Sequence, residues 1–201
     1  MGKGPKYKVA FKRRRQGKTN YRLRRKMVVS NTPRLVTRKS LKHITVQLII
    51  ATPEGDKTLI ACHSKELVND FNWKATCDNL PAAYLIGLIS GFRALSIGVN
   101  NSILDIGLQT PSPGSRVFAV LKGALQAGLN IPCNKVILPD DSRVKGEHIA
   151  SYAKKLFEDD PELYENMFSS YLSKGLKPEK IAKYINQVKN NIERLKGGKN
   201  G

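Results

Sequence analysis

Three consecutive residues near the N-terminus, Gly17-Lys18-Thr19, are of the types that bind nucleotide phosphates. A phosphate-binding loop has the pattern G-x-x-x-x-G-K-[ST] and follows a buried strand, because the backbone must wrap around the phosphates. In this sequence Lys12 occupies the position of the first glycine, and the preceding GPKYKVAF is not a hydrophobic strand. The context therefore disfavours a nucleotide-hydrolysing enzyme, and Gly17 is better interpreted as a flexible joint in a basic segment.

No other group of side chains has the pattern of a catalytic or metal site. The histidines lie in unrelated contexts without a recognisable nucleophile and acid, and the cysteines lack C-x-x-C spacing: His43, His63 and His148; Cys62, Cys77 and Cys133. An acidic cluster at residues 158–162 suits a helix start, where carboxylates interact favourably with the helix dipole. We therefore predict a non-enzyme with no cofactor and no metal, and reduced, partly buried cysteines typical of a cytoplasmic protein.

The positive charge of the chain is concentrated at its N-terminus. Residues 1–42 contain sixteen Lys and Arg and no acid, and the first acidic residue is Glu54. The rest of the chain has 19 basic and 16 acidic residues, so almost all of the net charge of +19 belongs to this one segment. Such a charge run requires a polyanionic partner, either a nucleic-acid backbone or an anionic membrane surface.

RNA suits this segment better than a membrane or DNA does. Tyr7, Phe11 and Tyr21 are interleaved with the cations and offer faces for unpaired bases. Residues 6–18 lack the apolar face of a membrane-surface helix, and the longest uncharged stretch, 79–92, is too short to span a bilayer. No DNA-recognition motif is visible. The simpler alternatives are a solvated charge run, a nuclear address or a mitochondrial transit peptide. No secretory signal is visible, because no apolar segment follows the basic N-terminus.

The remaining pattern predicts an α/β fold with a mixed sheet packed with helices. Residues 1–18 are expected to be disordered or extended, and Thr19 or Asn20 can cap a short basic helix. Three strands joined by short turns predict an antiparallel meander over 34–40, 43–50 and 57–64. They are followed by a buried helix over 82–95, a strand over 103–108, a helix from about 116 and a strand over 135–138. Three amphipathic helices complete the chain, which gives an arm (1–30), a core (31–138) and a helical extension (139–201).

Several segments together resemble a known family of ribosomal proteins. These segments are RRRQGKTNY (13–21), TPRLVTRKS (32–40), HITVQLI (43–49), PAAYLIGLISGFRA (81–94) and ILDIGLQTPSPGSRVFAVLKGALQAGL (103–129). They resemble the 5S rRNA-binding protein of the large ribosomal subunit, number eighteen in the universal scheme, in its archaeal form, which is kin to the eukaryotic large-subunit protein five. The resemblance covers residues 5 to about 150, and the helical tail favours the archaeal type.

The resemblance implies a structural protein of the ribosome in the cytoplasm that binds 5S rRNA and anchors it to 23S rRNA in the central protuberance. Its expected partners are those two RNAs and neighbouring large-subunit proteins, including the other 5S-binding protein, without a membrane. The rival hypothesis is an RNA-binding protein that acts off the ribosome. The expected RNA contacts lie in the arm, on the first strand and at a turn that begins a helix, where backbone N–H groups can meet phosphate: Lys6, Tyr7, Lys8, Lys12, Arg13, Arg14, Arg15, Lys18, Tyr21, Arg22, Arg24, Arg25, Lys26, Arg34, Arg38 and Lys39, then Thr110, Ser112, Gly114, Ser115, Arg116 and Lys122.

Overall fold

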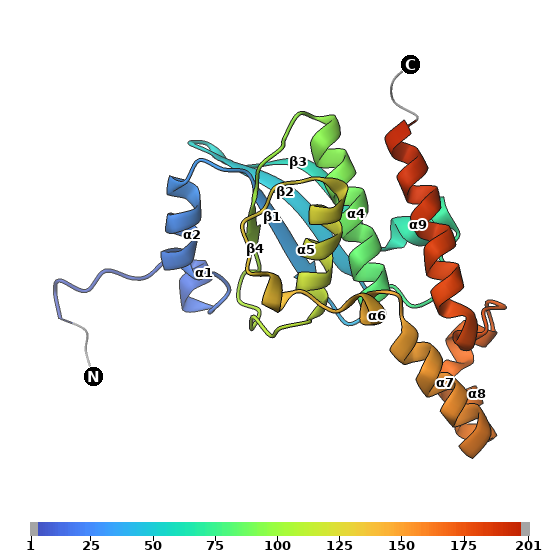
Figure 1. Cartoon of the computed structure of the whole chain (residues 1–201). Helices are drawn as coiled ribbons and strands as arrows, with labels where there is room; N and C mark the ends of the chain where they lie inside the picture. Colours follow the sequence, from blue (N-terminus) through green and yellow to red (C-terminus); the bar gives the residue numbers. More distant parts are fainter. Residues whose placement is uncertain (1–3, 198–201) are drawn as a thin grey trace.

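A mixed four-stranded sheet lies at the centre of the molecule, with the basic arm on one side and the C-terminal helices on the other (Figure 1). This computed structural model describes residues 4–197. The strand order is β3-β2-β1-β4. The strands are β1 (Arg34–Lys39), β2 (Ile44–Thr52), β3 (Gly55–His63) and β4 (Ile103–Asp105).

The first three strands form the predicted antiparallel meander, and β4 pairs in parallel with β1. Ile44, Val46 and Leu48 of β2 are buried, as their alternation predicts, because successive side chains of a strand point to opposite faces. The strand predicted over 103–108 ends early. Asp105 Oδ1 accepts the N–H of Gly107 at 2.8 Å, and Gly107 adopts a φ of +66°, so the chain turns directly after β4.

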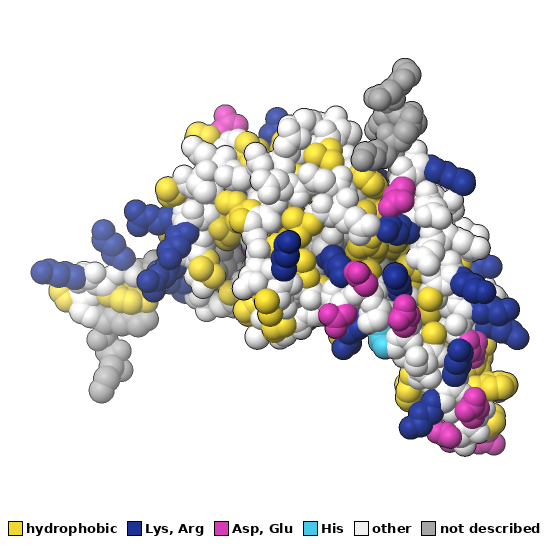
Figure 2. All heavy atoms as spheres, in the orientation of Figure 1, with side chains coloured by type: hydrophobic (Ala, Val, Ile, Leu, Met, Phe, Trp, Pro, Cys, Tyr) yellow, Lys and Arg dark blue, Asp and Glu magenta, His cyan; other side chains and the backbone are white. Residues whose placement is uncertain are grey.

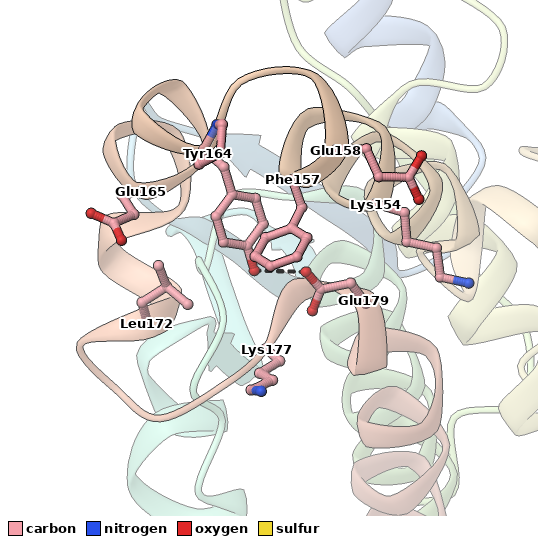
Figure 3. A pocket seen from close by; sticks show the side chains of 9 residues that line it. Lys154, Phe157, Glu158, Tyr164, Glu165, Leu172, Lys177 and Glu179 are labelled. Carbon is pink, nitrogen blue, oxygen red and sulfur yellow. Dashed lines mark hydrogen bonds between the residues drawn. The ribbon is translucent and has the colours of Figure 1, made fainter.

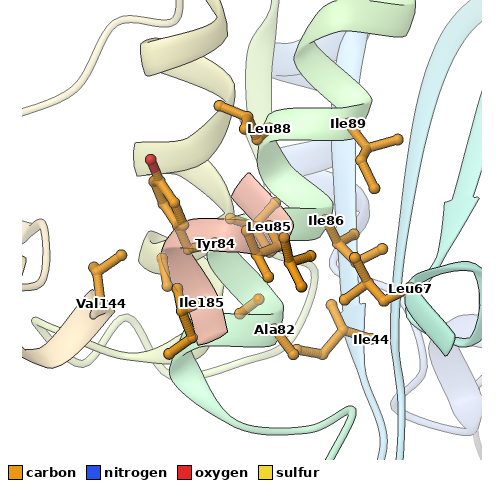
Figure 4. Packing of buried hydrophobic residues seen from close by; sticks show 14 of the residues in the cluster. Ile44, Leu67, Ala82, Tyr84, Leu85, Ile86, Leu88, Ile89, Val144 and Ile185 are labelled. Carbon is orange, nitrogen blue, oxygen red and sulfur yellow. The ribbon is translucent and has the colours of Figure 1, made fainter. Parts of the chain in front are cut away.

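Two helices cover one face of the sheet and contribute a large part of the core: α4 (Leu80–Ser96) and α5 (Arg116–Ala127). The side chain of Asn79 caps α4 by accepting the N–H of Ala82 at 2.8 Å. Most of α4 is buried, because this helix lies between the sheet, α5 and the C-terminal helices (Figure 4). The predicted buried helix is therefore confirmed.

The C-terminal segment consists of α6 (Asp141–Val144), α7 (Glu147–Asp159), α8 (Pro161–Leu172), the 3₁₀ turn η2 (Pro178–Lys180) and α9 (Ile181–Gly197). The three long helices were predicted. Ile181 and Ile185 of α9 are buried in the same hydrophobic cluster as α4, and Ile185 and Val144 lie beside Tyr84 in Figure 4. Because one cluster runs through both parts, the domain boundary near residue 138 stays a prediction.

Three local expectations need correction. Residues 135–138, predicted as a strand, contain a 3₁₀ turn, η1 (Lys135–Ile137), in which Asn134 Oδ1 accepts the N–H of Val136 at 3.1 Å. Within residues 4–197, no strand pairs with this segment. The helix α3 (Lys65–Phe71) was not predicted, because seven residues show little periodicity. In the arm, α1 (Lys12–Arg15) is one helical turn in a segment expected to be irregular.

Two glycines allow α4 and α5 to approach at backbone distance, which generates a prediction about stability. A Cβ at Gly123 would lie 2.2 Å from the carbonyl oxygen of Tyr84, and one at Gly87 would lie 2.1 Å from that of Val120. Overpacking of a core typically costs about 1–3 kcal/mol. Since the obstacle here is backbone, we expect Gly123→Ala to lower the free energy of unfolding by about 2 kcal/mol or more in urea titrations.

Gly4→Ala is the matched control, because nothing lies within 4 Å of a Cβ built at Gly4. At Gly123, inside α5, alanine would by itself stabilise the helix by about 0.5–1 kcal/mol relative to glycine, so a loss of stability there must come from the clash. A Gly123→Ala protein as stable as the Gly4→Ala protein would therefore show that the helices do not pack as closely as described.

Candidate nucleic-acid interface

The arm presents a cluster of solvent-exposed cations with no acid among them. Its second helix is α2 (Tyr21–Val29). Asn20 caps this helix by accepting the N–H of Leu23 at 3.2 Å, so of the two candidates from the sequence, Thr19 and Asn20, the cap is Asn20. Figure 2 shows Lys and Arg side chains gathered over the arm, whereas the acidic side chains on this face lie mostly over the C-terminal helices. The exposed arm cations among the predicted contacts are Lys6, Lys8, Lys12, Arg13, Arg14, Arg15, Lys18, Arg22, Arg25 and Lys26.

The Gly17-Lys18-Thr19 segment is the joint between α1 and α2. Gly17 adopts a φ of +62°, and Arg13 Nε donates to the hydroxyl of Thr19 at 2.8 Å, which folds α1 back toward α2. The rings of Phe11 and Tyr21 also approach, with centroids 5.6 Å apart. No strand precedes this joint within the described residues, so the structure gives no support to a phosphate-binding loop of the nucleotide-hydrolase type.

A single carboxylate attaches α2 to the sheet. Asp56, near the start of β3, accepts a hydrogen bond from Arg24 Nη2 of α2 at 2.8 Å, and its other oxygen lies 3.0 Å from Arg34 Nη2 of β1. Burial raises the pKa of Asp56, but the hydrogen bonds and charges of Arg24 and Arg34 lower it by more, so the net pKa lies below its usual value. Asp56 therefore stays ionised at neutral pH and holds both arginines.

Arg34 was predicted to contact RNA, but its side chain is only 4% exposed, so we leave it out of the proposed contacts. Its Nη1 donates to Asp105 Oδ2 at 2.9 Å, and Asp105 is itself buried. A buried arginine needs carboxylates beside it, since an unpaired buried charge is very unfavourable. Arg34 thus connects β1 to β3 through Asp56 and to β4 through Asp105, and it supports the surface from beneath.

Arg38 and Lys39, at the end of β1, remain at the surface. The side chain of Arg38 is 46% exposed, although its guanidinium donates to the backbone oxygen of Asp105 at 3.0 Å and packs against Gly107. Lys39 is exposed. These two residues extend the cationic surface from the arm onto the sheet, and their contact with RNA stays a prediction.

At the second predicted group, most of the polar groups are already bonded within the protein. The N–H groups of Ser112, Gly114 and Ser115 donate to backbone oxygens, and Arg116 Nη1 donates to the backbone oxygen of Asp78 at 2.7 Å. Lys122 Nζ lies 2.6 Å from Asp141 Oδ1. Thr110 is exposed. This turn has the contacts of an ordinary helix start, and RNA binding there stays a prediction for its exposed residues.

A contact between a serine and a histidine that are 21 residues apart was not predicted from the sequence. Ser64 Oγ lies 3.1 Å from His43 Nδ1, but Ser64 is fully buried and also accepts the N–H of Ile44, so the hydroxyl is not accessible to a substrate. The rings of His43 and His63 have centroids 4.8 Å apart, and burial together with the neighbouring His43 lowers the pKa of His63. These contacts fasten the ends of β2 and β3.

A pocket of about 420 Å³ between α7, α8 and η2 does not suit a polyanion (Figure 3). Glu158, Glu165 and Glu179 line it together with only two lysines. The hydroxyl of Tyr164 donates to Glu179 at 2.6 Å, and burial together with that carboxylate raises the pKa of Tyr164 to about 12. The negative charge of this pocket disfavours RNA phosphates, so the arm is the better candidate interface.

A comparison with known families matches the part of the chain that contains the basic arm, the sheet and the two core helices. The chain matches the family described as ribosomal large subunit proteins 60S L5, and 50S L18, over residues 5–102 and 98–134. The chain belongs to this family. It is therefore a protein of the large ribosomal subunit, of a structural rather than enzymatic family, and the resemblance noted in the sequence is confirmed.

The family match includes the arm, the sheet, α4 and α5, and it ends before α6. The C-terminal helices of this ribosomal protein thus lie outside the matched segments. Among residues 4–197, none of the helices combines the length and apolar character that crossing a membrane requires.

The contacts of Asp56 predict that this residue positions the arm. Asp56→Asn should weaken the attachment of α2, because an amide pairs poorly with two guanidinium groups. We expect faster hydrogen exchange in α2 and a loss of rRNA affinity of about fivefold, since partly exposed ion pairs contribute up to about 1 kcal/mol. The salt dependence of binding should not change, because no phosphate contact is removed.

Glu54→Gln provides the matched control, because it removes the same charge from the turn that precedes β3. Loss of a negative charge alone should strengthen RNA binding, so opposite effects of the two variants separate positioning from charge. The attachment should also weaken in the wild type at acidic pH, as the pH falls through the pKa of Asp56, which lies below the ordinary aspartate value. Equal affinities of the two variants would contradict the positioning role.

Proposed function

We propose that this ribosomal protein binds 5S rRNA through its N-terminal arm and anchors it to 23S rRNA in the central protuberance of the large subunit. The observation that carries the proposal is the attachment of an acid-free cationic arm to a folded sheet through Asp56. Family membership supports a place in the large subunit. The choice of these two RNAs rests on the resemblance to the 5S rRNA-binding branch.

The proposed RNA contacts combine charge with aromatic faces. Arginine in the densest part of the arm suits bidentate phosphate contacts, and Tyr21 offers a ring for stacking on a base. Arg24 Nη2 is paired with Asp56, but the side chain is 38% exposed, so part of the guanidinium remains accessible to RNA. The set consists of Lys6, Tyr7, Lys8, Lys12, Arg13, Arg14, Arg15, Lys18, Tyr21, Arg22, Arg24, Arg25, Lys26, Arg38 and Lys39.

The arrangement of the molecule supports different partners on its two sides. The arm lies at one end and the α7–α8 pair at the other (Figure 1). Since the pocket between α7 and α8 is rich in carboxylates, we assign this end to neighbouring large-subunit proteins, among which the other 5S-binding protein is the expected partner. The arm would then face the RNA, and the helical end would face protein.

The proposed RNA specificity is tested by competition. The protein should bind transcribed 5S rRNA in preference to tRNA at moderate salt by at least about tenfold, because specific contacts add to the charge-driven term that all RNAs share. Filter binding with labelled 5S rRNA and unlabelled competitor measures this ratio. Equal competition by tRNA would point to an RNA-binding function away from the 5S particle.

The arm is tested through the salt dependence of binding. Arg14, Arg15 and Arg22 are exposed, and a triple change of these residues to Gln should lower the slope of log K against log salt by roughly 2 to 3, because each lost phosphate contact contributes about 0.7–0.9. Arg13 is left intact because it bonds to Thr19.

Changing Lys154, Lys155 and Lys183 to Gln is the control for this measurement. These three lysines are exposed on the C-terminal helices, and their replacement removes the same total charge. The control protein should keep the wild-type slope. If both triple variants lower the slope equally, the phosphates are not met specifically by the arm.

A further inference from the structure

A cleft of about 600 Å³ lies between the arm and the sheet. One wall is formed by α2 and the joint before it, and the other by β1, β4 and the turn after β4. The cleft exists because Asp56 attaches α2 near the sheet without closing the space beside it. We refer to it as the arm cleft.

The arm cleft has apolar groups on both walls that the fold itself does not bury. Leu23 of α2 is 48% exposed, and Leu108 of the turn after β4 is 56% exposed. The half-buried Met27 and Ile49 and the buried Val36 also line the cleft. A surface that met only phosphates would gain nothing from exposed leucines, whereas the face of a nucleobase would be removed from water by them.

Cations surround this apolar lining. Lys18, Lys26 and Lys39 line the cleft, and none of them is paired with a carboxylate in the part of the chain that the structure describes. The two acids that line it, Asp56 and Asp105, are already paired with arginines. The lysines are therefore available for the phosphate of a bound group.

Gln109 also lines the cleft, and its Nε2 donates to the backbone oxygen of Thr37 at 3.0 Å. Its Oε1 is buried and accepts no hydrogen bond within the described residues, so this acceptor does not face a ligand in the present position of the side chain. The recognition chemistry of the cleft therefore comes from its apolar walls and its lysines, which match the base and the phosphate of a nucleotide.

We propose that the arm cleft binds one unpaired nucleotide of ribosomal RNA. Its base lies between Leu23 and Leu108, and its phosphate meets Lys18, Lys26 or Lys39. The volume suits one nucleotide, since small-molecule sites measure about 300–1,000 Å³. A double helix does not fit this description, because its bases are stacked on one another and its accessible minor groove displays base edges and 2′-hydroxyls rather than base faces. The proposal rests on the proposed function and adds the kind of nucleotide recognised.

Base-specific chemical footprinting of 5S rRNA and of 23S rRNA, in separate reactions, tests the proposal. The wild-type protein should protect an unpaired nucleotide in one of the two RNAs. Leu108→Ser and Leu23→Ser should each abolish that protection, leave the other protections intact and weaken binding by about fivefold, because apolar contact is lost. Both leucines are about half exposed, so the variants should fold.

Met167→Ser is the matched control, since Met167 is 58% exposed on α8, far from the arm (Figure 1). It should keep every protection. The proposal is overturned if Leu108→Ser and Leu23→Ser keep the wild-type footprint, or if the protection that they lose falls on a paired nucleotide. Failure of the wild-type protein to protect either RNA would instead refute the proposed function, so the two failures are distinguishable.

Discussion

The basic surface of this protein depends on one buried arginine held between two carboxylates. Arg34 pairs with Asp56 of β3 and with Asp105 of β4, and these two acids also hold Arg24 of the arm and Arg38 at the end of β1. Arg34 and Asp105 are both buried, and removing one partner from a buried pair leaves a charge without compensation and costs about 3–5 kcal/mol. The connection of the arm to the sheet and the position of the turn after β4 therefore depend on the same chain of ion pairs.

Two carboxylates in a surface that attracts phosphate reduce its positive potential, so their presence needs a physical reason. A flexible arm of like charges repels itself and must be ordered when it binds, and that ordering opposes binding. Attachment of α2 through Arg24 and Asp56 supplies part of this order in advance. On the other side of Gly17, α1 is connected to α2 by the Arg13–Thr19 hydrogen bond and the contact between the rings of Phe11 and Tyr21. Together, these contacts therefore position α2 on the sheet and α1 on α2.

Most of the fold could be predicted from the sequence because its signals are local. The alternation of Ile44, Val46 and Leu48, the caps Asn20 and Asn79 and the apolar run of α4 each act over a few residues. The errors arose where a partner far along the chain decides the outcome. KVIL has strand composition, but no neighbouring strand is available to it, and it forms a 3₁₀ turn.

The same limit applied to the site. The positions of the cations were readable from the sequence, but whether a given cation faces solvent depends on where the few acids of the chain lie after folding. Arg34 and Asp105 are 71 residues apart, and no pattern in the sequence connects them. Lys122 is likewise paired with Asp141 of the next helix. A charge run thus predicts the kind of partner, while the fold selects the residues that reach it.

The C-terminal helices of this protein provide a second surface, separate from the basic arm. They lie beyond the segments that match the family, yet α9 buries Ile181 and Ile185 in the same cluster as α4, on the side of the molecule away from the arm. That position keeps the carboxylates around the α7–α8 pocket distant from the arm cations. Over such a distance salt screens the interaction between exposed charges. The two ends are therefore electrostatically independent, and each can bind a partner of its own chemistry.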